Sequence, residues 1–177
     1  FFETASGLTT TGSSIIPDLS VLAHSSLFWR SFTHLVGGMG VLVFALAILP
    51  SHGSESVQLM RAEVPGPVFG KLVSKLAHTA QILYMIYLAM TAVLVIILVV
   101  FQVPLFDALL LAFGTAGTGG FGINNAGFSI YANSAAVEWI IGVGMMLFGI
   151  NFNLYYFVLL GAVKDVIKDE EVRTYVG

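Results

Sequence analysis

The chain has 177 residues, of which 57% are hydrophobic and only 10% are charged, and its mean hydropathy is +0.92. Soluble domains have roughly 45–50% apolar and about 25% charged residues, so this composition indicates a membrane protein. The sequence contains no cysteine, which excludes disulfides, thiolate metal sites and cysteine nucleophiles. The net charge of -3 and the lack of a basic run argue against a nucleic-acid partner.

The chain begins with a short apolar stretch, residues 1–6, that runs into a strip rich in threonine and glycine, Thr9-Thr10-Thr11-Gly12-Ser13. The opening letters FFETASG follow no initiator methionine or signal peptide and resemble the last turns of a helix. We therefore expect the chain to be a fragment whose first helix is truncated.

Two long apolar segments follow this strip. Turn formers predict a loop over residues 15–26. Residues 27–49 carry one charge, Arg30, and would extend about 34 Å as a helix, enough to cross a hydrocarbon core of roughly 30 Å. Charged, proline and glycine residues predict a solvated loop over 50–75, and the apolar run 76–101 predicts a second spanning helix.

The second half of the chain contains a predicted helix that is too short to cross a membrane. Pro104 at the first helical position and Asp107 in the first turn predict this helix over 104–113. It would extend about 15 Å, half of a bilayer core. The glycine-rich stretch 114–127 cannot be helical throughout, because glycine is unfavourable in helix interiors. The apolar segment 135–163 predicts a third spanning helix.

The positive charges predict the orientation in the membrane. Six of the seven Lys and Arg residues lie in the loop 51–75 and the tail 164–177, which we therefore expect to be cytoplasmic. The opposite connections, 13–26 and 123–134, contain no Lys or Arg. The glycine-rich runs beside them should therefore lie on the external side.

The chain contains an internal repeat. Thr10-Thr11-Gly12 aligns with Thr118-Gly119-Gly120 at an offset of 108 residues, and Trp29 aligns with Trp139 at an offset of 110. Each copy reads half-helix, glycine strip, loop, tryptophan and a long helix that contains glycines. Repeats of this kind are common in transport proteins.

The two strips have the composition of a cation site made from backbone. Irregular backbone at membrane depth is tolerated only where it is buried in protein or lines a water-filled cavity. Glycine permits the positive φ angles that let successive carbonyls face one way, and carbonyl and threonine oxygens can replace the water shell of an alkali cation. Neither strip contains an acidic side chain, which favours a monovalent over a divalent cation.

Several motifs, in this order, resemble the bacterial potassium-uptake family of the TrkH and KtrB type: SGLTTTGSS, FWRSFTHLVGGMGVLVFALAILP, RAEVPGP and FDALLLAFGTAGTGGFG. The resemblance implies an all-α, polytopic membrane protein in which four helix–pore helix–filter–helix repeats surround one pore, as in potassium channels. The chain would then comprise a partial first repeat (1–49), a cytoplasmic loop (50–75), a complete second repeat (76–163) and a cytoplasmic tail (164–177).

The same resemblance implies potassium uptake through a selectivity filter. The family has one key filter glycine per repeat, here Gly12 and Gly120. The implied filter residues are Thr10, Thr11, Gly12, Thr118, Gly119 and Gly120. Glycine at the first key position, where sodium-transporting plant relatives have serine, indicates potassium. Potassium would be the transported substrate, with no organic cofactor.

The resemblance also implies a location and partners. The protein would span the bacterial cytoplasmic membrane several times, pair as a homodimer and bind a cytoplasmic ring of nucleotide-binding regulatory subunits. The sequence leaves open whether transport is channel-like or coupled to protons or sodium.

Other interpretations compete with this one. The strips could be ordinary external loops, although the duplication and the preceding half-helix are unexpected for a plain loop. A sodium-permeable or transport-inactive scaffold relative is the alternative function. An enzyme is disfavoured, because His24 beside Ser25 and Ser26 is only a loop cluster without the G-x-S-x-G context of a serine nucleophile.

Polar side chains in the apolar segments also have two interpretations each. Glu138 could concentrate cations at the pore mouth, but snorkelling or an interhelical pair explains both Glu138 and Arg30 better. His34 could sense protons, but an interhelical histidine with satisfied nitrogens is favoured. Asn151 and Asn153 are expected to hydrogen-bond at helix contacts.

Overall fold

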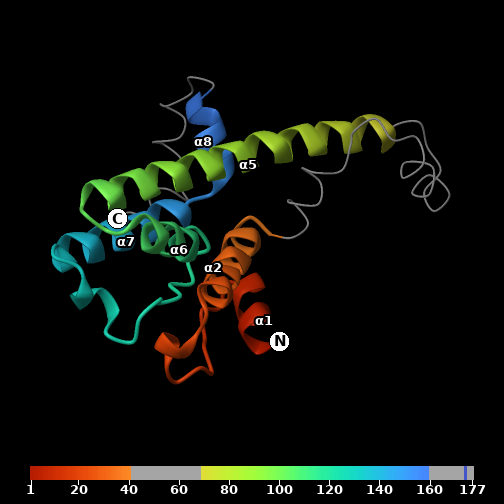
Figure 1. Ribbon diagram of the computed structural model, residues 1–177. Coiled ribbons are helices and arrows are strands. Elements are labelled where there is room, and N and C mark those ends of the chain that lie inside the picture. Colours follow the sequence, from red (N-terminus) through yellow and green to blue (C-terminus); the bar gives the residue numbers. More distant parts are fainter. Residues whose placement is uncertain (41–68, 160–173, 175–177) are drawn as a thin grey trace.

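The computed structural model describes residues 1–40, 69–159 and 174, and over these residues the regular structure is entirely helical (Figure 1). The expected all-α class is confirmed. The elements, with η for a 3-10 helix, are α1 (Phe2–Leu8), η1 (Leu19–Val21), α2 (His24–Gly38), α5 (Phe69–Val100), α6 (Leu105–Ala116), η2 (Gly127–Ile130), α7 (Ser134–Phe148) and α8 (Phe152–Leu159).

The long helix α5 crosses one side of the molecule, with α6 and α7 packed against it (Figure 1). The short helix α1 packs against α2, and α2 in turn packs against α6. Helix α2 therefore joins the predicted first repeat to the predicted second.

Helix α5 is longer than the sequence predicted. It begins at Phe69, so that the last part of the predicted loop 50–75 is helical. Its segment His78–Val100 is, among the described residues, the one helix both long and apolar enough to cross a membrane. At 23 residues this segment extends about 34 Å. Most of it is not buried by the rest of the chain, which leaves its apolar surface available to lipid or to further protein.

Helix α2 starts earlier than predicted, at His24 rather than at residue 27. It ends at Gly38, and Gly40 follows with a φ of +72°. The remainder of the predicted span, 41–49, lies outside the described residues, as does the polar segment 50–68.

The predicted half-helix is confirmed as α6. Asp107 lies in its first turn, as expected, whereas Pro104 is the N-cap and not the first helical residue, and the helix continues to Ala116. Its 12 residues extend about 18 Å, so that it does not cross a bilayer. The Tyr131 hydroxyl donates to the Asp107 carboxylate at 3.0 Å and ties the start of α6 to the loop that precedes α7. Burial and this carboxylate raise the pKa of Tyr131, which keeps the phenol a hydrogen-bond donor.

The prediction of one continuous helix over 135–163 is wrong. Helix α7 ends at Phe148, and α8 begins at Phe152. Gly149 is the C-cap of α7, which agrees with the high cost of glycine inside a helix. The Tyr155 hydroxyl reaches back across the break and donates to the Leu147 carbonyl at 2.7 Å, a carbonyl that also accepts from the Ile150 amide at 3.2 Å.

The buried core lies between α5, α6 and α7 and continues towards α2. Tyr87 on α5 is fully buried, and its ring meets Phe148 and Phe152 edge-on. Its hydroxyl donates to the Leu35 carbonyl at 2.9 Å. Because Leu35 is in the last turn of α2, this bond satisfies a carbonyl that has no partner within its own helix.

Candidate functional site

Two irregular strips follow directly on short helices. The first strip, residues 9–14, leaves the C-terminal end of α1, and the second strip, residues 117–122, leaves the C-terminal end of α6. The end of a helix exposes carbonyl groups and carries a partial negative charge. Both strips therefore begin at a place where a cation is favoured.

The strips share one backbone conformation in one register. The φ angles are +55° at Thr10 and +54° at Thr118, and they are +74° at Gly12 and +68° at Gly120. Each pair is 108 residues apart, which is the offset that the sequence predicts. Left-handed backbone suits glycine but is unusual for a β-branched residue such as threonine. The same strained conformation is thus adopted at equivalent positions of the two repeats.

The hydrogen bonds from each strip to its helix also repeat at this offset. They use strip amides as donors, so the strip carbonyl oxygens are the groups left to contact an ion. The four bonds, donor first, are Thr10 to Gly7, Thr118 to Thr115, Thr11 to Ser6 and Gly119 to Gly114, at 2.9, 2.9, 2.9 and 3.3 Å.

The two strips touch each other. A Cβ atom added at Gly12 would overlap the Gly119 carbonyl, and one added at Gly119 would overlap the imidazole of His34. Gly120 is less crowded, since the nearest atom to an added Cβ is the Met145 methyl group at 3.0 Å. Close approach therefore requires glycine at Gly12 and Gly119, in addition to the positive φ at Gly12 and Gly120.

All the sequence-predicted filter residues lie on these strips, and the structure brings the two strips together. The hydroxyl of Thr11 shares a 2.8 Å hydrogen bond with that of Thr9, which also donates to the Ala5 carbonyl at 2.8 Å. Thr9 was not among the predicted residues. That these residues coordinate an ion stays a prediction.

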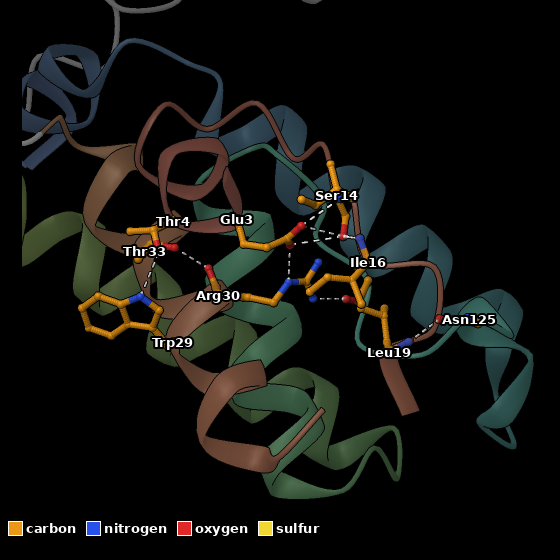
Figure 2. Close-up of polar contacts among 11 residues, drawn as sticks. Glu3, Thr4, Ser14, Ile16, Leu19, Trp29, Arg30, Thr33 and Asn125 are labelled. Atoms are coloured by element: carbon orange, nitrogen blue, oxygen red, sulfur yellow. Dashed lines mark hydrogen bonds and ion pairs between the residues drawn. The ribbon is translucent and has the colours of Figure 1, made fainter. Parts of the chain in front are cut away.

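An ionic cluster lies beside the strips (Figure 2). Arg30 on α2 pairs with Glu3 on α1 through an Nε to Oε2 contact of 2.6 Å. The Arg30 guanidinium also donates to the Gly122 carbonyl at 3.3 Å and lies 4.3 Å from the centre of the Phe121 ring. The interhelical pair expected for Arg30 is confirmed. Glu3 was not among the predicted residues, although an acidic residue in an apolar membrane segment is expected to have a charged or hydrogen-bonding partner.

A second link joins the loops that follow the two strips. The side chain of Asn125 accepts a hydrogen bond from the Leu19 amide at 3.0 Å (Figure 2). It also donates to the Pro17 carbonyl at 2.8 Å. The Asn125 side chain thereby holds the loop that follows the first strip against the loop that follows the second strip.

His34 lies between helix α2 and the second strip. Its ring is fully buried, meets Phe121 edge-on at 4.2 Å, and packs on Gly117 and Gly119. Within the part of the chain that the structure describes, neither ring nitrogen has a hydrogen-bond partner. The interhelical position is thus confirmed. The expectation of satisfied nitrogens is wrong at ordinary hydrogen-bond geometry, although the Thr10 backbone lies close to the ring. The ring is held mainly by steric contacts with the second strip and with Phe121.

The other polar residues lie away from the strips. Glu138 is exposed on α7, and Asn151 is exposed between α7 and α8. The side chain of Asn153 lies outside the described part.

A large cavity lies away from the strips. It has a volume of about 690 Å³ and lies between α5 and α7, with Val93, Ile97, Trp139, Val143 and Leu147 among its lining residues. Because this lining is almost wholly apolar, the cavity cannot replace the water around a cation. The carbonyl and threonine oxygens expected of an ion site lie in the strips.

A long apolar helix, two half-helices and two matching strips together define a polytopic membrane protein built from pore-helix repeats. The family model described as TrkH, cation transport protein, matches residues 1–174. The chain belongs to this TrkH family of cation transport proteins.

Similar proteins agree with this family. The Trk system potassium uptake protein TrkH of Salmonella typhimurium is 38% identical over 100% of the chain and 37% of its own length. The Trk system potassium uptake protein TrkG of Escherichia coli K12 is 35% identical over 98% of the chain and 36% of its length.

The fold agrees with a solved structure. The crystal structure of the potassium transporter TrkH from Vibrio parahaemolyticus has a TM-score of 0.72 and 31% identity, over 99% of this chain and 35% of that one. The chain thus spans a little more than a third of the length of the relatives it matches.

Proposed function

We propose that the two strips form two sides of a potassium selectivity filter and that the intact transporter containing this segment takes up potassium. The observation that carries the proposal is the repeated backbone of the strips, with left-handed residues at Thr10 and Gly12 and again at Thr118 and Gly120. The relatives that match over the whole chain are named as potassium uptake proteins.

The chemistry of the strips suits a monovalent cation. Carbonyl oxygens can replace the hydration shell of potassium without adding net charge, and the ends of α1 and α6 add partial negative charge nearby. Among the described residues there is no group of three or more acidic or histidine side chains that could hold a metal ion. Potassium is therefore the transported substrate in this proposal.

The proposed membrane location, orientation and partners rest on the same family. The protein resides in the bacterial cytoplasmic membrane, with the loop 51–75 and the tail 164–177 on the cytoplasmic side. It pairs as a homodimer and binds a cytoplasmic ring of nucleotide-binding subunits. The positive charges of the two cytoplasmic segments support this orientation.

Substitution of the key glycines tests the filter. In the intact transporter, Gly12→Ser and Gly120→Ser should each lower the ratio of potassium to sodium uptake, because serine disfavours the positive φ that aims the carbonyls. Gly12→Ser should have the larger effect, since its Cβ would also overlap the Gly119 carbonyl. The ratio for each variant is measured as uptake of potassium and of sodium into transport-deficient bacterial cells. Uptake is normalised to the amount of protein in the membrane.

Each alternative function predicts a different experimental result. Unchanged potassium uptake and selectivity in both variants would mean that the strips are not the filter. Equal uptake of sodium by the unaltered transporter would indicate a sodium-permeable relative. Absence of any cation flux in liposomes would indicate a transport-inactive scaffold.

A further inference from the structure

We infer that the Glu3–Arg30 pair is a positioning device that fixes the spacing between the two strips and thereby sets the discrimination between potassium and sodium. This inference rests on the proposed function of the strips. It concerns a pair of residues that is not itself in either strip.

Arg30 is buried, Glu3 is partly buried, and both side chains are held by further hydrogen bonds. The side chain of Arg30 is 5% exposed and that of Glu3 is 16% exposed. A buried pair of charges costs desolvation energy that is recovered only with good geometry and further hydrogen bonds. Both partners have such bonds, and all of them lead to the strips (Figure 2).

Glu3 holds the end of the first strip. Its carboxylate accepts hydrogen bonds from the Ser14 hydroxyl at 3.0 Å and from the Ile15 amide at 2.9 Å. Ser14 is the last residue of the first strip, two positions after Gly12. The direction in which the first strip leaves the site is therefore fixed to α1 through Glu3.

Arg30 holds the end of the second strip. Its guanidinium donates to the Gly122 carbonyl, two positions after Gly120, and rests on the ring of Phe121. The planar guanidinium donates to Glu3 through Nε and to Gly122 through a different nitrogen, so one rigid group spans both partners. The two strips are thus tied at equivalent positions, each two residues after its filter glycine.

The pair is not an ion ligand. A guanidinium has only donors and would repel a cation, and the Gly122 carbonyl is already engaged by it. Because the carboxylate neutralises the arginine, the pair adds little net field to a passing ion. Its contribution is geometric, and selectivity depends on how firmly the carbonyls keep their separation.

Arg30→Lys in the intact transporter is the principal test. Lysine keeps the charge but replaces two donor nitrogens with one, so the link to Gly122 or to Glu3 weakens. The ratio of rubidium to sodium flux in proteoliposomes should fall about tenfold, the change expected from the loss of one charge-assisted hydrogen bond.

Ser14→Ala is a milder second variant. It removes the hydroxyl bonded to Glu3 at an exposed position, where folding is not at risk. The flux ratio should fall about threefold, in the same direction as for Arg30→Lys, because one weaker hydrogen bond is lost.

Thr4→Val is the matched control. Thr4 accepts a hydrogen bond from the Trp29 indole at 3.1 Å, which joins the same two helices, α1 and α2, without reaching the second strip (Figure 2). Valine has the shape of threonine but lacks the acceptor. Its flux ratio should equal that of the unaltered transporter.

The outcomes separate the two proposals. Normal flux with an unchanged ratio in Ser14→Ala, and in Arg30→Lys if that variant folds, would overturn the positioning role while leaving the filter in place. An equal fall in Thr4→Val would also overturn it, because any weakening of the α1–α2 contact would then suffice. No potassium or rubidium flux through the unaltered transporter would instead reject the proposed function.

Discussion

Gly119 is restricted by a neighbouring side chain and not by its own backbone angle. Its φ is not positive, yet an added Cβ would overlap the imidazole of His34. At Gly12 the obstacle is backbone, which cannot move aside, whereas at Gly119 it is a side chain that can be removed by mutation. The two glycines are therefore needed for different physical reasons.

This difference gives a prediction at the scale of single residues. Gly119→Ala should destabilise the intact transporter by about 1–3 kcal/mol, the usual cost of overpacking a buried site. In a His34→Ala background, which removes the obstructing ring, the same substitution should cost at least about 1 kcal/mol less. Thermal unfolding of the purified single and double variants in detergent measures this coupling. Additive effects would show that His34 does not press on Gly119.

The sequence predicts the positive φ angle that requires glycine, but it does not predict the contact with a distant side chain that also requires glycine. The positive φ at Gly12 and Gly120 follows from a glycine pattern that recurs within a local stretch. The contacts of Gly119 with His34 and of Glu3 with Arg30 join segments distant in the chain, and no local pattern encodes them. The left-handed Thr10 and Thr118 could not be predicted either, because β-branched residues normally avoid that conformation.

At the scale of helices, the packing of α2 depends on small residues. A Cβ at Gly37 would lie 2.5 Å from the Leu8 carbonyl oxygen and 2.8 Å from that of Gly7. Helix α2 thus rests directly on the end of α1, where the first strip begins. Gly142 on α7, in contrast, has no atom within 4 Å of an added Cβ.

Alanine at these two glycines should have opposite effects. Gly37→Ala should destabilise the protein by about 1–3 kcal/mol through the clash with backbone that cannot yield. Gly142→Ala should be neutral or stabilising by up to about 1 kcal/mol, because alanine favours helix and nothing obstructs it. The unfolding temperature of each purified variant distinguishes the two positions. A similar loss in both would mean that helix glycines matter here for flexibility and not for packing.

The helices themselves were predicted well where local signals are strong. Pro104 and Asp107 marked the start of α6, and its shortness separated it from the spanning helices. The break between α7 and α8 was missed although Gly149, Asn151 and Asn153 lie at it, because the long apolar runs on both sides dominate the hydropathy of the segment. Hydropathy measures how strongly a segment prefers lipid, and it does not indicate whether the helix is continuous.

At the scale of the whole molecule, the described residues provide two strips, which form two sides of the proposed filter. In the proposed filter a cation exchanges its water shell for oxygens on all sides, and two strips cannot surround it. The 177-residue segment, purified and reconstituted alone, should therefore give no rubidium flux above that of protein-free liposomes. The intact transporter in the same lipid is the positive control. Flux through the segment would mean that its copies assemble into a complete pore.

The contacts between the repeats also bear on the order in which the chain is made. Gly122 and Asn125 bond to Arg30, Leu19 and Pro17, all of which lie more than 90 positions earlier in the sequence. Synthesis proceeds from the N-terminus, so the first repeat has left the ribosome before the second strip is complete. The earlier repeat can then act as a template on which the later strip takes its shape during membrane insertion.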